Sequence, residues 1–154
     1  MEESVKKVLL SLQRLCVKRE CCSDEIYRKA LQKVDGDAAT AGEILGSLKA
    51  DAFVDDARYA AAFAREKSSL TGWGPIKIRF ALRGKGVGEA EISAALEGID
   101  AEKAEARLLK DLAAKWKTLE GEPDAKLRLI KYALAKGYGY DAVQSAVERT
   151  VCDG

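Results

Sequence analysis

The sequence of 154 residues contains no histidine. Histidine is the side chain that most often serves as general acid or base, and it is a common zinc ligand, so its absence removes the usual Ser–His and Cys–His nucleophiles. The glycine patterns of dinucleotide-binding loops, phosphate-binding loops and hydrolase nucleophile elbows are missing too. We therefore expect a protein that is not an enzyme and binds no cofactor.

Long hydrophobic runs are also absent. No stretch approaches the roughly 20 apolar residues of a membrane span, and segment 1–7 carries charges of both signs. The 26 basic and 25 acidic residues leave a net charge of +1, so bulk charge favours neither nucleic acid nor membrane nor an acidic substrate. We expect a soluble, cytoplasmic protein with no membrane partner.

The cysteines are few and irregularly spaced: Cys16, Cys21, Cys22 and Cys152. Their spacing is not that of a disulfide framework. Zinc binding would need paired C-x-x-C spacing or histidine ligands, and the sequence has neither. We expect reduced thiols and no bound metal.

Only two prolines occur, Pro75 and Pro123, and each precedes a run with helical apolar spacing, where a fixed backbone angle and a missing amide are tolerated. The two runs end about 50 residues apart at the same element, KGVG at 85–88 and KGYG at 136–139. An amphipathic helix follows each element. These features indicate an internal repeat, whose apolar pairs one turn apart are Ile92 with Leu96 and Val143 with Val147.

A third copy precedes these two. Ile44 and Leu48 form the same apolar pair, and Thr40 and Glu43 before them have the spacing of a capping box. Each copy also opens with a helix, expected over 5–18, 56–67 and 101–117.

Acidic residues stand at two of these helix starts. Asp55 and Asp100 are expected N-caps. The adjacent Asp55 and Asp56 could also suggest a metal site or a carboxylate pair, but acids at a helix start ordinarily complement the positive helix end. We favour the cap.

Three copies of three helices predict an all-α protein of three tandem three-helix repeats in an elongated array, because stacked repeats bury faces that no single unit can cover. We place the repeats at 1–52, 53–99 and 100–154. No segment shows the period-two alternation of a strand.

Basic residues concentrate in the middle of the chain. Segment 58–86 holds seven basic residues and one acidic residue, a net charge of +6 that leaves −5 for the rest. Such a segment can neutralise phosphates or dock on an acidic protein surface. On a helix from Pro75, Arg79 and Arg83 share one face, apart from the apolar stripe of Ile78 and Leu82. The alternative is an ordinary solvated helix face, with Lys85 simply favoured by the helix dipole.

Trp73 stands between two glycines in segment 68–74. There it could stack on a base or anchor a protein partner. The alternative is a tryptophan folded back over a helix junction.

The segment 54–65 (VDDARYAAAFAR), followed by 73–79 (WGPIKIR) and by Leu82, Lys85, Gly86 and Val87, resembles the second repeat of the RecX family. The match is densest from 53 to 96, and the flanks agree in repeat length, helix order and apolar spacing. Ala81 departs from the pattern, because the family often has an acidic residue there. The loop before Trp73 is also less basic than in many members.

The resemblance implies a curved array that lodges in the groove of a RecA filament on DNA and restrains RecA ATP hydrolysis and strand exchange in homologous recombination, DNA repair and the SOS response. The implied partners are the RecA filament and single- or double-stranded DNA, and we expect a monomer. A DNA-binding module that acts without RecA and a repeat scaffold for another protein remain as alternatives. The candidate contact residues are Arg65, Lys67, Trp73, Lys77, Arg79, Arg83 and Lys85.

Overall fold

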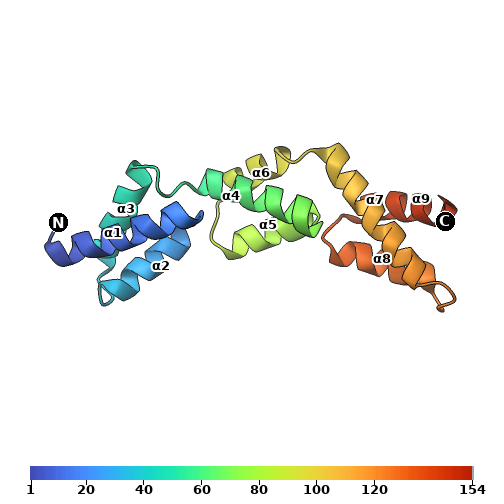
Figure 1. Cartoon of the computed structure of the whole chain (residues 1–154), viewed down its shortest axis with the longest axis horizontal. Coiled ribbons are helices and arrows are strands. Elements are labelled where there is room, and N and C mark those ends of the chain that lie inside the picture. The colour runs from blue at the N-terminus through green and yellow to red at the C-terminus, as the bar shows by residue number, and fades with distance from the viewer. Residues whose placement is uncertain (154) are drawn as a thin grey trace. The chain divides into compact units, whose positions relative to one another are not determined.

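The computed structural model describes residues 1–153 as nine α-helices and one π-helical turn, with no strand in that range (Figure 1). The helices follow one another in three groups of three, which confirms the predicted all-α fold of three tandem three-helix repeats. The elements are α1 (Glu3–Lys18), α2 (Ser23–Lys33), α3 (Ala38–Ala50), α4 (Asp56–Glu66), the π-helical turn (Lys67–Thr71), α5 (Pro75–Gly84), α6 (Glu89–Glu97), α7 (Ala101–Thr118), α8 (Ala125–Ala135) and α9 (Tyr140–Asp153).

Asp55 and Asp100 cap α4 and α7, as predicted. The Asp100 side chain accepts hydrogen bonds from the backbone amides of Glu102 and Lys103, at 3.0 and 3.2 Å. The Asp55 side chain accepts one from the amide of Arg58 at 3.1 Å. These bonds satisfy amides that have no partner inside the helix.

The predicted capping box at Thr40 is wrong. Helix α3 begins at Ala38, and Asp37 is its N-cap, accepting from the Thr40 amide at 3.1 Å and from the Thr40 hydroxyl at 2.7 Å. The same bonds hold the pKa of the Asp37 carboxyl below its usual value. Aspartate caps at least as well as threonine and alanine favours the helix interior, so the helix starts earlier and Thr40 lies in its first turn.

Glycines terminate α5 and α8 as predicted. Gly86 and Gly137 follow these helices with φ of +78° and +99°, in the left-handed region that glycine adopts without steric cost. The next residues, Val87 and Tyr138, are buried. The KGxG element therefore stops a helix and turns an apolar side chain into the core.

Helix α4 ends at Glu66, within one residue of the predicted end. The π-helical turn Lys67–Thr71, which was not predicted, continues the chain until Gly72, at φ +73°. The Trp73 amide then donates to the Lys67 carbonyl at 2.9 Å. The wider turn sets the carbonyls of this segment at positions that a regular α-helix would not give.

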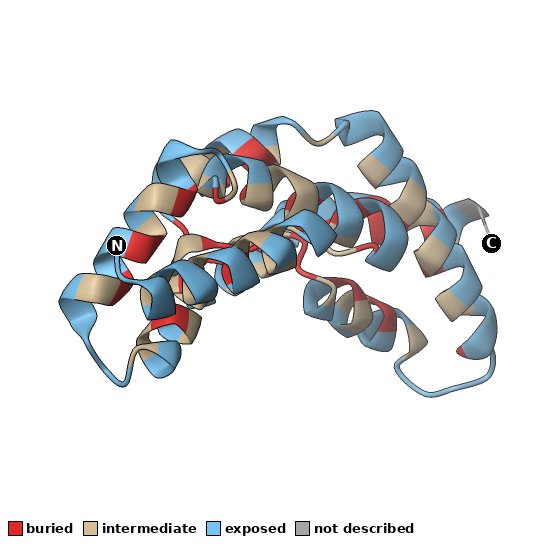
Figure 2. Ribbon diagram, turned by 60° about the vertical axis from the view of Figure 1, so that its left-hand side comes forward, coloured by how far each residue is buried: buried red, intermediate tan, exposed pale blue. Residues whose placement is uncertain are grey.

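Two compact units make up the described chain. Unit 1 contains Met1–Ala62 and Leu82–Ala95, and unit 2 contains Phe63–Ala81 and the chain from Leu96 onward. In Figure 2, residues coloured as buried recur along the helices between exposed ones. The unit 1 core consists of Leu12, Cys21, Ile26, Ala30, Ala41, Ile44, Leu48 and Val54. The unit 2 core consists of Leu108, Leu112, Leu119, Leu129, Ala133, Tyr138, Val143, Ala146 and Val147.

Unit 1 holds the contact between the first and second repeats, which we call the first junction. The amide of Ser23, at the start of α2, donates to Asp56 Oδ1 at 2.7 Å. The Cys22 thiol donates to the Lys85 carbonyl at 3.6 Å, and Arg58 pairs with Glu20 at 2.5 Å. Side chains therefore make most of this junction.

Unit 2 holds the contact between the second and third repeats, which we call the second junction. The amides of Gly74 and Ile76 donate to the carbonyls of Lys136 and Gly137, at 2.7 and 2.9 Å. A Cβ on Gly74 would lie 2.5 Å from the Gly137 carbonyl, closer than any side chain allows. The two backbones meet directly, so the Gly74-Pro75 motif and the KGYG element form one structure.

None of the described helices combines the length and the apolar character needed to cross a membrane.

Candidate interaction surface around Trp73

Trp73 lies at the centre of an aromatic and cationic cluster in unit 2. Its indole packs edge-on against Phe63 of α4, with ring centroids 6.3 Å apart. The ammonium groups of Lys67 and Lys77 lie 4.9 and 4.6 Å from the indole centroid. Such contacts contribute on the order of 1 kcal/mol each. The half-buried indole thus folds back over the end of α4 and holds two of the candidate lysines in place.

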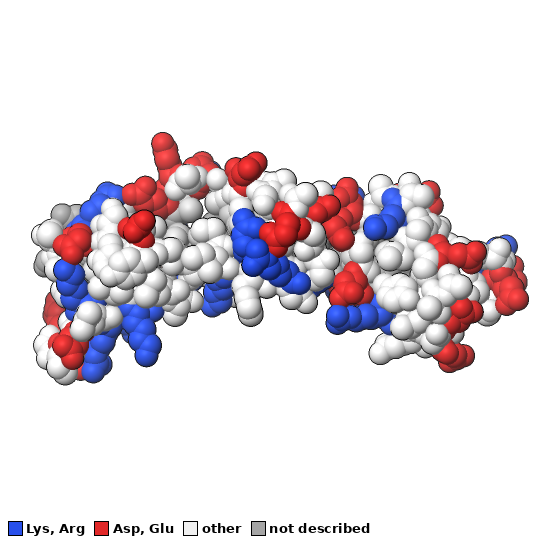
Figure 3. Space-filling view, turned by 180° about the vertical axis from the view of Figure 1, so that it is seen from behind, with Lys and Arg blue, Asp and Glu red and all other residues white. Residues whose placement is uncertain are grey.

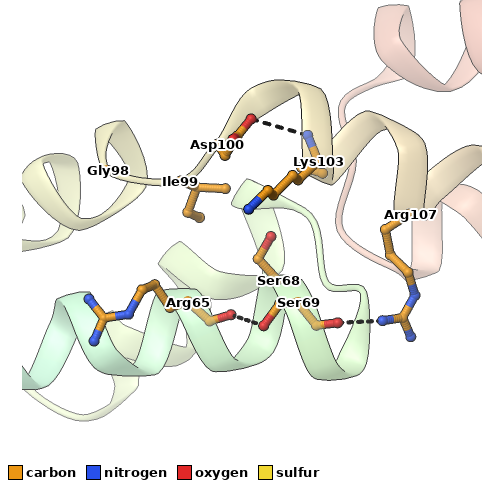
Figure 4. A pocket seen from close by; sticks show the side chains of 9 residues that line it. Arg65, Ser68, Ser69, Gly98, Ile99, Asp100, Lys103 and Arg107 are labelled. Carbon is orange, nitrogen blue, oxygen red and sulfur yellow. Dashed lines mark hydrogen bonds between the residues drawn. The ribbon is translucent and has the colours of Figure 1, made fainter.

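A pocket of about 410 Å³ opens beside this cluster, between the end of α4 and the start of α7 (Figure 4). Three basic residues line it: Arg65, Lys103 and Arg107. Ser69 also lines the pocket, and its hydroxyl donates to the Arg65 carbonyl at 2.7 Å. One acid, Asp100, lies at the wall, where α7 amides already engage its carboxylate. The pocket therefore presents more positive than negative charge.

Arg107 fixes the π-helical turn to α7. Its guanidinium donates to the carbonyl of Ser69 at 2.5 Å (Figure 4). It also donates to the carbonyl of Leu70 at 3.3 Å and pairs with Asp111 at 3.0 Å. Lys136 also pairs with Asp111, at 3.2 Å. This network was not predicted from the sequence. Its only sequence signal is the i, i+4 spacing of Arg107 and Asp111, which is common on ordinary helix surfaces.

The other candidate cations lie along α5 and just after it. Ile78 and Leu82 are fully buried, as predicted for the apolar stripe, while Arg79 is half-buried and Arg83 and Lys85 are exposed. Arg83 forms an ion pair with Glu89, which raises the pKa of its guanidinium. Basic and acidic side chains alternate on the face shown in Figure 3, without one continuous basic area.

The structure assigns the seven candidates to two units. Five of them belong to unit 2 and two, Arg83 and Lys85, to unit 1. Lys67, Trp73 and Lys77 are in mutual contact through the indole, and Arg65 lines the neighbouring pocket. The unit 2 members are Arg65, Lys67, Trp73, Lys77 and Arg79.

The surroundings of the cysteines and of the Asp55–Asp56 pair are those of structural residues. All four thiols are free, and burial raises the pKa of Cys21 to about 12. Asp55 caps α4, and Asp56 accepts the Ser23 amide. Within the described residues no group of three or more cysteine, aspartate or glutamate side chains is arranged to hold a metal ion.

A family model described as the second three-helix domain of RecX matches residues 55–96. Two curated relatives from Clostridium botulinum are named "Regulatory protein RecX". The strain Eklund 17B protein is 34% identical over 125 residues, covering 79% of this chain and 57% of its own length. The strain Alaska E43 protein is 30% identical over 139 residues, covering 88% and 65%. The chain therefore contains a segment that matches the second three-helix domain of the RecX family, and it is similar to RecX proteins over most of its length.

Solved RecX structures have the same fold. A crystal structure of regulatory protein RecX superposes with a TM-score of 0.84 at 22% identity, covering 95% of this chain and 72% of that one. RecX from Lactobacillus salivarius superposes with a TM-score of 0.82 at 14% identity, covering 99% of both chains. At these identities the likeness concerns the fold alone.

The region matched by the RecX family model contains all seven candidate residues, the Trp73 cluster and the α5 cations. The two clostridial relatives are named as regulatory proteins. The chain spans 57% and 65% of their lengths.

Proposed function

We propose that this chain binds the RecA nucleoprotein filament and inhibits RecA ATP hydrolysis and strand exchange in recombination and DNA repair, without catalysing a reaction of its own. The observation that carries the proposal is the match of segment 55–96 to the RecX family, since that segment holds the Trp73 cluster. We further propose that the repeats divide at 52/53 and 99/100 and that the chain acts in the cytoplasm as a monomer.

The charges around Trp73 support this role. Among residues 1–152, whose side chains the structure describes, no carboxylate forms an ion pair with Arg65, Lys67, Lys77 or Lys103. Cations without a carboxylate partner are available to a phosphate or to an acidic protein surface. A filament on DNA offers both.

The test is the DNA-dependent ATPase of RecA, titrated with the chain. We expect inhibition at roughly stoichiometric amounts, because a regulator that occupies the filament acts by binding. The Arg65→Ala/Arg79→Ala variant should need several-fold more protein for half-inhibition at unchanged helicity. The matched control is Lys110→Ala/Lys131→Ala, which removes the same charge from exposed positions of α7 and α8. An unaffected ATPase would contradict the proposal, and equal losses in both variants would contradict the site assignment.

The second candidate function is a DNA-binding module that acts without RecA. The observation in its favour is the aromatic ring between two lysines, an arrangement that suits base stacking beside phosphates. A salt titration of binding to single-stranded DNA separates the two. This candidate would be favoured by tight binding and an unaffected RecA ATPase. The logarithm of the binding constant should then fall linearly with the logarithm of the salt concentration. If neither assay responds, the remaining alternative is a scaffold for another protein.

A further inference from the structure

The outward face of α5 carries two large apolar side chains. Phe80 is 79% exposed and Ile76 is 57% exposed. They lie one helical turn apart and so stand side by side. Tyr140, also exposed, directly follows Gly139, and the Ile76 Cδ1 lies 3.9 Å from the position of a Cβ on that glycine. We call Ile76, Phe80 and Tyr140 the apolar ridge.

Cations border this ridge. Each residue of an α-helix is rotated by about 100° about the helix axis from the one before it. Arg79 and Lys77 therefore lie about 80° to either side of the line through Ile76 and Phe80, and Ile78 lies opposite that line. The burial agrees, because Ile78 is fully buried while the ridge is exposed. Helix α5 contains three basic residues and no acidic residue. The face therefore has an apolar centre and a positive rim.

We propose that the apolar ridge anchors the chain to a protein partner whose surface carries an apolar cleft bordered by acidic side chains. Isolated exposed apolar residues are ordinary, but adjacent exposed ones within a polar rim are typical of protein interfaces. Energetically important residues at interfaces are large, central and surrounded by contacts that exclude water. The cationic rim favours an acidic border on the partner, through charge complementarity.

A nucleic acid is the competing occupant of this face, because Phe80 and Tyr140 have rings on which bases could stack. The aliphatic Ile76 beside them favours a protein partner, because its side chain gains from burial in an apolar cleft and nothing from stacking. The aromatic ring that does lie beside two lysines is Trp73, and it belongs to the cluster described above. The ridge and the cluster are therefore separate features of unit 2.

The inference rests on the proposed function in one respect, namely that the partner used to test it is RecA. We suggest measuring the affinity of the whole chain for RecA filaments on single-stranded DNA, and for the same DNA alone. The Ile76→Ser/Phe80→Ser variant should bind filaments about tenfold more weakly or worse, with DNA affinity unchanged within about twofold. Phe80→Leu, which keeps an apolar side chain, should retain most of the affinity.

The matched control is Leu127→Ser, because Leu127 is 64% exposed on α8 and lies outside the ridge. It should bind filaments like the unmodified chain, and circular dichroism melting should show that all variants fold. Unmodified protein that binds filaments, with ridge variants that bind equally well, would overturn this inference alone. Parallel loss of DNA affinity would overturn it in favour of a nucleic-acid contact. Failure of the unmodified chain to bind filaments would overturn the proposed function as well.

The acidic border has its own test. Arg79→Glu should lower the association rate with the filament, most strongly at low salt, because like charges then oppose each other. A faster association at low salt would overturn the acidic character of the partner.

Discussion

At the first junction, the second helix of the first repeat, α2, begins at Ser23. The backbone amide of Ser23 donates to the Asp56 carboxylate at 2.7 Å. At the second junction, the equivalent helix begins with Pro75, which has no amide to satisfy. No carboxylate is needed there, and the neighbouring amides of Gly74 and Ile76 reach the backbone of the next repeat instead. The first junction is thus made mainly by side chains and the second by main chains.

The difference determines how each junction tolerates change. A side-chain contact can adjust its rotamers, whereas two backbones at contact distance leave no space for a new Cβ. The shared KGxG element therefore ends a helix in both places. Only at the second junction does it also lie in contact with another backbone. Mutations at equivalent positions should have unequal effects, which the following experiments measure.

The largest expected effect is that of Gly137→Ala. The new Cβ would clash with Lys77 and would force alanine into a left-handed conformation, so we expect a loss of about 3 kcal/mol of unfolding free energy. Gly86→Ala should cost about 1–2 kcal/mol, since the nearest atom, the Asp24 Cβ, lies 3.1 Å away. Gly36→Ala is the control, with a positive φ but open space around it.

Urea unfolding can assign each loss to its unit. Both tryptophans, Trp73 and Trp116, belong to unit 2, so their fluorescence reports that unit, while circular dichroism reports both. Gly137→Ala should lower the urea midpoint that is measured by fluorescence. Gly86→Ala should lower mainly the midpoint that is measured by circular dichroism. Equal losses in the two variants would contradict the distinction between the junctions.

A smaller effect is expected for Arg107→Ala, at about 2 kcal/mol. The change removes three hydrogen-bonded partners of a guanidinium that is only 30% exposed, and it leaves the Asp111 carboxylate with Lys136 alone. Arg58→Ala at the first junction should cost about 0.5 kcal/mol, because that ion pair is more exposed to solvent. Arg107→Lys keeps the charge but lacks the planar guanidinium, which donates in several directions at once, so it should recover only part of the stability. If lysine restores full stability, the carbonyl contacts are unimportant.

Asp56→Ala should cost less than Arg107→Ala, about 1 kcal/mol, through loss of the acceptor for the Ser23 amide. Asp56→Asn keeps an acceptor oxygen and should retain most of the stability. The loss should be visible by circular dichroism and not by tryptophan fluorescence. A matching fluorescence shift would mean that the carboxylate supports more than the first junction.

Much of the fold is encoded in local patterns that can be read from the sequence. Pro75, the glycines of the KGxG elements and the Asp55 and Asp100 caps all act within one or two turns of their own position, and the structure places helix boundaries at each of them. The capping box was wrong because two capping residues, Asp37 and Thr40, compete within one turn, and local pattern alone did not rank them.

The surface around Trp73 was less accessible to sequence reasoning. Basic residues at 65, 67 and 77 were found because they cluster along the chain, but Lys103 and Arg107 join them only through the contact between repeats. The exposure of Phe80 was missed for a related reason. An apolar residue in an amphipathic helix is ordinarily assigned to the core, and only the arrangement of Ile78 and Leu82 shows which stripe is buried.

The π-helical turn has a consequence for the lengths that this segment can have. A π-turn is equivalent to one extra residue in a helix, and here it presents the carbonyls of Ser69 and Leu70 to Arg107. Deletion of one residue between 67 and 71 would remove the extra residue and let this segment close as a regular α-helical turn, while the residues after it keep their places. The carbonyls that Arg107 binds would then be displaced, so the deletion should weaken the contact between the turn and α7. Substitutions should be better tolerated here than deletions.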